Sequence, residues 1–301
     1  DSLGDVWAFE DTMIVRFHGL TPRRVWLNGQ QVLAPDAMAI DPSGTVWLTD
    51  QSIGLARLVH NRLEPVAPAT EIGRFTSLVS DRAGRLWVGS TGRVVVYDHG
   101  KVTVFGEAEG VKAGQISDLY EDRSGIMWAV GAGGIHRFEG ARFRTLTERQ
   151  ALPGRAVFGI TEDNTGAWWL ATRAGLLRLE PNELARAFAD AGHILRYRVF
   201  DRLDGLPGAI GMTKLPVLTR SADGKIWVGA DEGVAYIDPR NLGANDVPLK
   251  VLVETVRIDG RELAPSDVTA IPAGNSSVEI DYTATALSFA ERIQFRFRLE
   301  G

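Results

Sequence analysis

The chain of 301 residues contains no cysteine. This absence excludes disulfides, thiol catalysis and cysteine-bound metal centres, and it leaves the redox compartment unreadable from the sequence. The net charge is −5 without a run of like charges, so no nucleic-acid partner is expected. The chain has no apolar run of about 18 residues or more and no basic-then-apolar leader. Contact with a membrane is therefore expected only through a segment outside this sequence.

Histidine is also scarce, and its spacing carries no metal-binding pattern. None of the five residues fits H-x-H or H-E-x-x-H, so we expect neither a metal site nor a cofactor, and we interpret the histidines as surface or turn residues. They are His18, His60, His99, His136 and His193.

Tryptophan, in contrast, follows a repeat. The core G-x-x-W occurs six times, separated by 40, 40, 41, 41 and then 58 residues, and a period near 40 is typical of propeller blades. The repeated residues are Gly4 and Trp7, Gly44 and Trp47, Gly84 and Trp87, Gly125 and Trp128, Gly166 and Trp169, and Gly224 and Trp227.

Each repeat is predicted to be a four-stranded antiparallel sheet. In the second to fifth copies an aspartate stands three residues before the glycine, where it can bind backbone amides while the glycine takes a positive φ. Apolar runs such as 75–79 and 86–88 on either side of this turn are typical of strands. A second glycine, five to seven residues after the tryptophan, sets the next turn. The four aspartates are Asp41, Asp81, Asp122 and Asp163.

One small sheet cannot bury both faces, but sheets packed radially against similar neighbours can. We therefore predict an all-β chain in which residues 1–245 form a β-propeller with about six visible four-stranded blades, in a ring of six or seven. Each repeated tryptophan is expected to pack between adjacent blades. Because Asp1 stands only three residues before the first core, we expect an incomplete first blade and a longer parent protein.

The remaining segments depart from the repeat. In the long last interval, residues 181–192 predict a short helix whose N-terminus is capped by the Asn182 side chain and which has Leu184 and Phe188 on one face. Residues 246–301 lack the tryptophan pattern. Their alternating runs at 250–258, 277–284 and 294–299 predict the first part of an immunoglobulin-like β-sandwich.

Ligand chemistry is expected in the loops at the ends of the central channel, because neighbouring blades cover both faces of every sheet. Aligned on their glycines, the repeats place four residues just before the inner strand, and Arg155 lies one residue earlier. The four are Arg74, Gln115, Ala156 and Lys214. Three of them can donate hydrogen bonds, which suits an acidic sugar or another anion. Asp118 and its equivalent Ser77 are further candidates, and a merely solvated loop is the alternative.

Other polar and aromatic residues give weaker indications of a binding or catalytic site. Trp26 and Trp168 lie outside the repeated position, where they can stack on a sugar ring or cap a blade edge. Glu121-Asp122 and Glu162-Asp163 recur in register, but turn anchoring explains them better than paired-carboxylate catalysis. No catalytic residue is predicted.

Several stretches in order resemble a known family. They are the D-x-x-G-x-ϕ-W-ϕ-G repeat, DGLPG at 204–208, IWVGADEGVAYIDPRNL at 226–242, and VEIDYTATALSF followed by FRFRLEG within 278–301. Together they resemble the two-component-regulator propeller (Reg_prop) followed by the start of a triple-tyrosine (Y_Y_Y) domain. The sequence departs from that pattern at Asp223, which stands next to Gly224, and at Phe295 and Phe297, which stand where tyrosines can occur.

The resemblance implies the periplasmic sensor portion of an inner-membrane bacterial receptor. It implies a histidine kinase or diguanylate cyclase module outside this fragment, a small-molecule ligand such as a carbohydrate, and a homodimer. Two other functions compete with this one. A propeller lyase of the streptogramin-degrading type has similar hairpins but needs histidine general-base chemistry and a metal, and many propellers dock proteins on a flat face.

Overall fold

The computed structural model describes residues 4–10, 13–25, 35–68, 70, 75–146, 152, 156–211, 216–242, 250–264 and 277–284. The chain divides into two compact units, Asp1–Asn241 and Leu242–Gly301. The predicted boundary between residues 245 and 246 lies outside the described ranges. Within those ranges, no helix has the length and apolar character needed to cross a membrane.

The described residues of unit 1 form six antiparallel sheets, here called blades 1 to 6. Blade 1 consists of β1 (Val6–Glu10), β2 (Met13–His18) and β3 (Thr21–Val25). Blade 2 consists of β4 (Ala37–Ile40), β5 (Val46–Asp50), β6 (Gly54–Val59) and β7 (Arg62–Ala67). Blade 3 consists of β8 (Phe75–Ser80), β9 (Leu86–Ser90), β10 (Arg93–Asp98) and β11 (Lys101–Phe105).

The other three blades follow the same order. Blade 4 consists of β12 (Ile116–Glu121), β13 (Met127–Gly131), β14 (Gly134–Phe138) and β15 (Phe143–Leu146). Blade 5 consists of β16 (Val157–Glu162), β17 (Trp168–Thr172), β18 (Gly175–Leu179) and β19 (Tyr197–Phe200). Blade 6 consists of β20 (Leu218–Arg220), β21 (Ile226–Ala230) and β22 (Gly233–Ile237).

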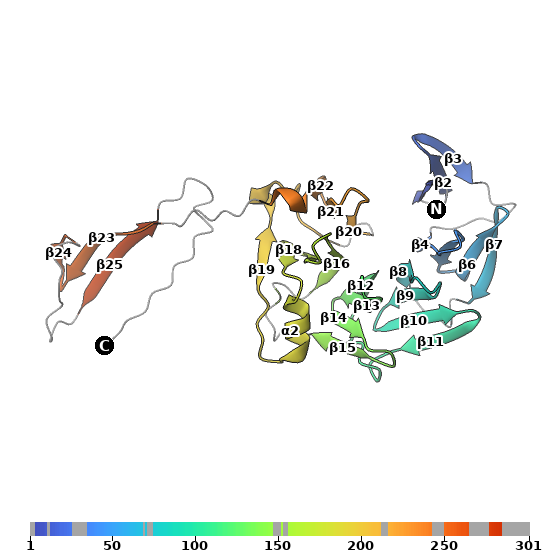
Figure 1. Ribbon diagram of the computed structural model, residues 1–301, viewed down its shortest axis with the longest axis horizontal. Coiled ribbons are helices and arrows are strands. Elements are labelled where there is room, and N and C mark those ends of the chain that lie inside the picture. Colours follow the sequence, from blue (N-terminus) through green and yellow to red (C-terminus); the bar gives the residue numbers. More distant parts are fainter. Residues whose placement is uncertain are drawn as a thin grey trace. The chain divides into compact units, whose positions relative to one another are not determined.

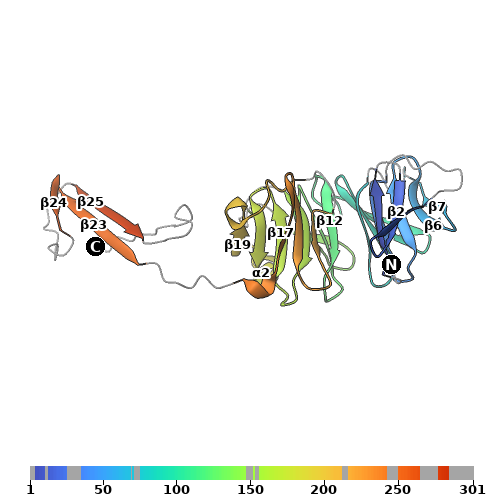
Figure 2. The ribbon, with the colours of Figure 1, turned by 90° about the horizontal axis from the view of Figure 1, so that it is seen from above.

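The blades follow one another along a curved path, with the first strands of blades 2 to 6 on its inner side (Figure 1). The inner strands β4, β8, β12, β16 and β20 pack side by side in that order. In Figure 2 the blades are seen edge on, as sheets standing beside one another. The fold is therefore a β-propeller, as predicted. In the described residues, blade 1 lacks the inner strand and blade 6 has three strands instead of four.

The aspartate–glycine turn forms as the sequence predicts. All six repeated glycines have φ between 79° and 86°. The Oδ1 atom of Asp81 accepts hydrogen bonds from the backbone N–H groups of Ala83 (3.0 Å) and Arg85 (2.9 Å), and its Oδ2 accepts one from Trp87 Nε1 (2.8 Å). The same three bonds recur at Asp41, Asp122 and Asp163. One carboxylate thus fixes both the turn and the indole.

Blade 6 uses a different acceptor. Ser221 stands in the aspartate position, and its Oγ accepts the Trp227 Nε1 hydrogen bond at 3.0 Å while bonding Asp223. Although the aspartate of this repeat stands at position 223, the Trp227 indole therefore still has a hydrogen-bond acceptor, the Ser221 hydroxyl.

The prediction that the tryptophans pack between blades holds for blades 2 to 4. Trp87 is 1% exposed and lies against Phe105 of its own blade and Phe138 and Phe143 of blade 4. Trp47 and Trp128 are buried in equivalent clusters with the next blade. Trp169 is fully buried on Phe200 of its own blade. The exceptions are Trp7, which is half-buried, and Trp227, which is 36% exposed.

The predicted insertion forms α2 (Glu183–Ala189), followed by β19 and the short 3₁₀ helix η2 (Arg202–Asp204). Leu184 and Phe188 are buried as expected. Phe188 lies 4.7 Å from the Arg137 guanidinium and packs on Trp128, which places α2 beside the outer strands of blade 4 (Figure 1). The predicted side-chain cap is wrong, because Asn182 makes no capping bond.

After blade 6 comes the 3₁₀ helix η3 (Pro239–Asn241). In unit 2, the described residues form one sheet of β24 (Arg261–Leu263), β23 (Val251–Ile258) and β25 (Val278–Ala284), paired in that order. The cross-strand partners Val256, Leu263 and Ile280 share one face of the sheet. The run 294–299 lies outside the described residues, and the immunoglobulin-like sandwich stays a prediction.

Candidate functional site

The predicted ligand site lies where the inner strands begin. Arg74, Arg155 and Lys214 are outside the described residues, so the structure does not show where they lie. Gln115 and Asp118 are described; Gln115 directly precedes β12 of blade 4, and Asp118 is the third residue of that strand. Of the predicted ligand site, the described residues therefore include only the part at the start of β12.

Gln115 is held by its backbone between two turns. Its carbonyl accepts a hydrogen bond from Ala132 N at 3.0 Å, and it forms a bridge with Thr91 of blade 3. The neighbouring carbonyl of Gly114 accepts one from Gly92 N at 2.7 Å. The approach is close: a Cβ on Gly131 would lie 2.0 Å from the Gln115 carbonyl oxygen. Because Gly131 has no side chain, β13 can approach the Gln115 backbone closely and hold it in place.

This contact gives a first prediction. Gly131→Ala should lower the free energy of unfolding by about 2–3 kcal/mol, since its methyl group overlaps backbone that must move away. Gly211→Ala is the control, because a Cβ there meets nothing within 4 Å. Urea unfolding followed by circular dichroism measures both, and equal midpoints would contradict the prediction.

Asp118 joins the inner strands of blades 4 and 5. It follows a β-bulge in β12, and its Oδ1 accepts a hydrogen bond from Leu119 N at 2.9 Å. Its Oδ2 accepts one from Ile160 N of β16 at 3.1 Å. The residue is partly buried, and desolvation raises the pKa of Asp118 to about 7 although both N–H bonds lower it.

The residues equivalent to Asp118 also face the next blade. Ser77 is buried, and its Oγ has no hydrogen-bond partner among the described residues; it lies over Gly89 toward Ile116. At Gly159 a Cβ would lie 2.7 Å from Leu218 Cβ of blade 6. This position is therefore a junction between inner strands, and at Asp118 the junction carries a carboxylate.

The other predicted residues lie elsewhere. Trp168 is buried against Trp128 and Tyr120, with ring centroids 4.9 Å and 6.2 Å away, so it belongs to the core and is closed to a ligand. Trp26 lies outside the described residues. Of the histidines, His60 and His99 occupy turns at positive φ.

His136 contradicts the surface or turn interpretation. It is fully buried in β14, where Nδ1 lies 2.8 Å from Thr145 Oγ1 and burial lowers its pKa to about 4. In the described part of the chain, no three histidine, aspartate or glutamate side chains are grouped as ligands for a metal.

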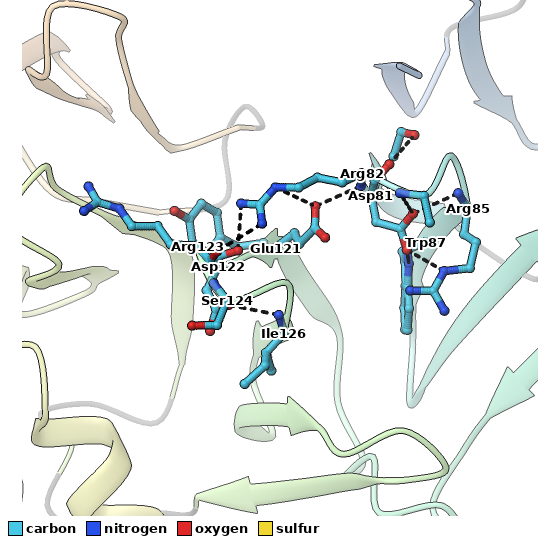
Figure 3. Close-up of polar contacts among 12 residues, drawn as sticks. Asp81, Arg82, Arg85, Trp87, Glu121, Asp122, Arg123, Ser124 and Ile126 are labelled. Atoms are coloured by element: carbon cyan, nitrogen blue, oxygen red, sulfur yellow. Dashed lines mark hydrogen bonds and ion pairs between the residues drawn. The ribbon is translucent and has the colours of Figure 1, made fainter. Parts of the chain in front are cut away.

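At the opposite end of the inner strands, an arginine and a glutamate link adjacent blades (Figure 3). Arg82 donates from Nη2 to the Asp122 carbonyl (2.9 Å) and from Nη1 to the Arg123 carbonyl (3.1 Å). Glu121 accepts the backbone N–H of Arg82 through Oε2 at 3.0 Å. We call this set of contacts the interblade latch.

The latch recurs one blade further along. Arg123 donates to the carbonyls of Asp163 and Asn164, and Glu162 accepts its backbone N–H at 3.1 Å. Burial raises the pKa of Glu162, and Tyr120 Oη donates to it at 3.4 Å. The register of the two glutamates is visible in the sequence, but their hydrogen bonds to the preceding blade were not predicted. The signal was an arginine directly after the turn aspartate of the blade that precedes each glutamate, Arg82 before Glu121 and Arg123 before Glu162.

These features define the class of the protein as a β-propeller of consecutive antiparallel blades. The sequence matches no family model and no curated protein. Among solved structures, the chain is similar to the extracellular domain of BT3049 from B. thetaiotaomicron, assigned to a hybrid two-component system. The TM-score is 0.69 at 19% identity, over 92% of this chain and 37% of that one.

Two other solved structures show weaker similarity. A streptogramin B lyase has a TM-score of 0.57 at 13% identity, over 78% of this chain and 76% of that one. PorZ of Porphyromonas gingivalis, a surface component of the type-IX secretion system, has a TM-score of 0.56 at 14% identity, over 82% and 39%. At these identities the similarity establishes the fold. The chain spans little more than a third of the BT3049 domain.

Proposed function

We propose that this chain is the ligand-sensing part of an extracytoplasmic bacterial receptor, and that it binds a small molecule such as a saccharide where the inner strands begin. The observation that carries the proposal is the extent of the similarity to the BT3049 extracellular domain. Unit 1 holds 241 of the 301 residues, about four-fifths, whereas that similarity covers 92% of the chain. It therefore continues into unit 2.

The polar groups at the start of β12 support a binding role. Gln115 is partly exposed, and its backbone is fixed by bonds to blades 3 and 4. A backbone held in this way loses little entropy when the side chain binds a ligand. In the proposed receptor this fragment is non-catalytic and periplasmic, a histidine kinase or diguanylate cyclase lies outside it, and the whole protein works as a homodimer.

The alternative enzyme, a lyase, is favoured by one observation, the similarity of 78% of the chain to streptogramin B lyase. None of the five histidines lies at the start of β12 to act as the general base that such an enzyme needs. His136 is buried in β14, His60 and His99 occupy turns, His18 ends β2 beside Asp5, and His193 follows α2 beside Glu183. A docking propeller is the other alternative.

A thermal-shift screen tests the proposal. Mono-, oligo- and acidic saccharides are added to the purified chain, and a binding sugar raises the unfolding midpoint. Ligand at 100 times its dissociation constant stabilises by about 2.7 kcal/mol. Gln115→Ala should abolish the shift, whereas Lys101→Ala on the outer strand β11 should leave it unchanged. Chromatography of the incubated sugar distinguishes binding from turnover. A sugar converted to product, or no shift with any sugar, would overturn the proposal.

A further inference from the structure

The interblade latch provides a template for an anion site. At the junctions of blades 3 and 4 and of blades 4 and 5, the residue after the turn aspartate presents its backbone N–H to a glutamate of the next blade. The N–H···Oε2 distances are 3.0 Å to Glu121 and 3.1 Å to Glu162. The chain thus places a carboxylate at the same point twice.

The junction between blades 5 and 6 breaks this pattern. Here the residue after the turn aspartate is Asn164, and the residue equivalent to the two glutamates is Arg220. Arg220 Nη1 donates to Asn164 Oδ1 at 2.5 Å. Within the described residues, the Asn164 backbone N–H has no acceptor, and no carboxylate oxygen lies within 4.0 Å of the Arg220 guanidinium. A positive charge has replaced the carboxylate, and the N–H that it would bind stays in place.

Asn164 is held rigidly at this junction. Its carbonyl accepts a hydrogen bond from Arg123 Nη1 at 3.0 Å, and its side-chain amide packs against Gly224, where a Cβ would lie 2.6 Å from Nδ2. Both Asn164 and Arg220 are exposed. Glu162, the nearest carboxylate of the latch, is already bonded to the backbone of Arg123. The Asn164 backbone is therefore anchored by Arg123, and the exposed Arg220 side chain is bonded to the Asn164 side chain beside it.

We infer that the blade 5–6 junction binds the carboxylate of a small acidic ligand, such as a sugar acid, between the Asn164 N–H and the Arg220 guanidinium. The ligand oxygen takes the place that Glu121 and Glu162 occupy at the two preceding junctions. A guanidinium and a backbone N–H acting together make charge-assisted hydrogen bonds, which are stronger than neutral ones. The site is distinct from the proposed sensing site, because Gln115 and Glu121 mark opposite ends of β12.

The test is a titration of ¹⁵N-labelled chain with glucuronate, followed at the Asn164 backbone amide resonance. We expect a saturable shift with glucuronate and no shift with glucose at the same concentration. Arg220→Glu should abolish the shift and raise the thermal midpoint, because the new carboxylate completes the latch. Arg142→Glu, which makes the same charge change at an exposed turn, should keep the shift.

A second variant covers the case in which Arg220→Glu fails to fold. Arg220→Gln should weaken glucuronate binding by about tenfold or more, since it removes the charge and keeps a polar side chain. Retention of full affinity in either variant, or a wild-type chain in which glucuronate and acetate leave the Asn164 amide unmoved, would overturn the inference. A shift with sulfate as large as that with glucuronate would contradict the assignment to carboxylates. Gln115→Ala should leave this titration unchanged, so failure here and failure of the proposed sensing site are distinguishable.

Discussion

Replacing Trp87 with alanine is expected to lower the free energy of unfolding by about 3–5 kcal/mol, the cost of deleting a large, fully buried aromatic side chain. The indole is 1% exposed, packs on three phenylalanines of blades 3 and 4, and donates to Asp81 at 2.8 Å. Its loss leaves a cavity at the blade junction and removes one of the hydrogen bonds to a buried carboxylate. The urea midpoint, followed by circular dichroism, measures the effect.

The matched control is the same residue of the repeat in blade 6. Trp227 is 36% exposed, and among the described residues its aromatic partner is Tyr236, with ring centroids 5.0 Å apart. Trp227→Ala should therefore cost about 1 kcal/mol. If Trp87→Ala and Trp227→Ala lowered the free energy of unfolding equally, packing between blades would not be the source of the stability that Trp87 contributes.

The repeat could be predicted from sequence because its interactions are local. The turn aspartate, the glycine and the tryptophan lie within seven residues, and their bonds close within that span, as Asp81 does with Trp87. Composition and period then indicate a propeller, because four-stranded units of this kind bury their faces only against one another. Blade 6 shows where local reasoning fails: the aspartate moved to position 223, and Ser221 took over its bond to the indole.

Contacts between blades were harder to predict. The latch joins residues about one repeat apart, such as Arg82 with Glu121, and no pattern inside a single repeat records it. Asp118 was chosen for its place near the channel, yet its bond to Ile160 could not be foreseen, because it depends on how the inner strands stand beside each other. His136 was misplaced for a similar reason. Its partner Thr145 belongs to the neighbouring strand β15, and a lone histidine shows no burial pattern.

The second large effect concerns Asp118 and pH. The pKa of this carboxyl is about 7 in the folded chain, against 3.8 for the free group, and burial is the main cause. Below about pH 4 both the folded and the unfolded chain hold the proton, and the contribution of Asp118 to stability is fully present. As the pH rises, the unfolded chain ionises first, and stability falls until the folded carboxyl ionises near pH 7. At about 1.4 kcal/mol per pKa unit, the loss is at most about 4 kcal/mol.

Asp118→Asn removes this titration. The amide oxygen can still accept the Ile160 N–H, but one acceptor is lost, so the variant should be less stable than wild type near pH 4 by about 1 kcal/mol. At pH 8 the order should reverse, because only the wild type then carries a buried charge at this junction. Asp41, Asp163 and Glu183 have lowered pKa values and lose stability as the pH falls. They act equally in both chains, so the difference between wild type and variant isolates Asp118. Asp98→Asn, at the exposed end of β10, is the control. A wild-type minus Asp118→Asn difference that stays constant from pH 4 to pH 8 would show that folding does not raise the pKa of the Asp118 carboxyl.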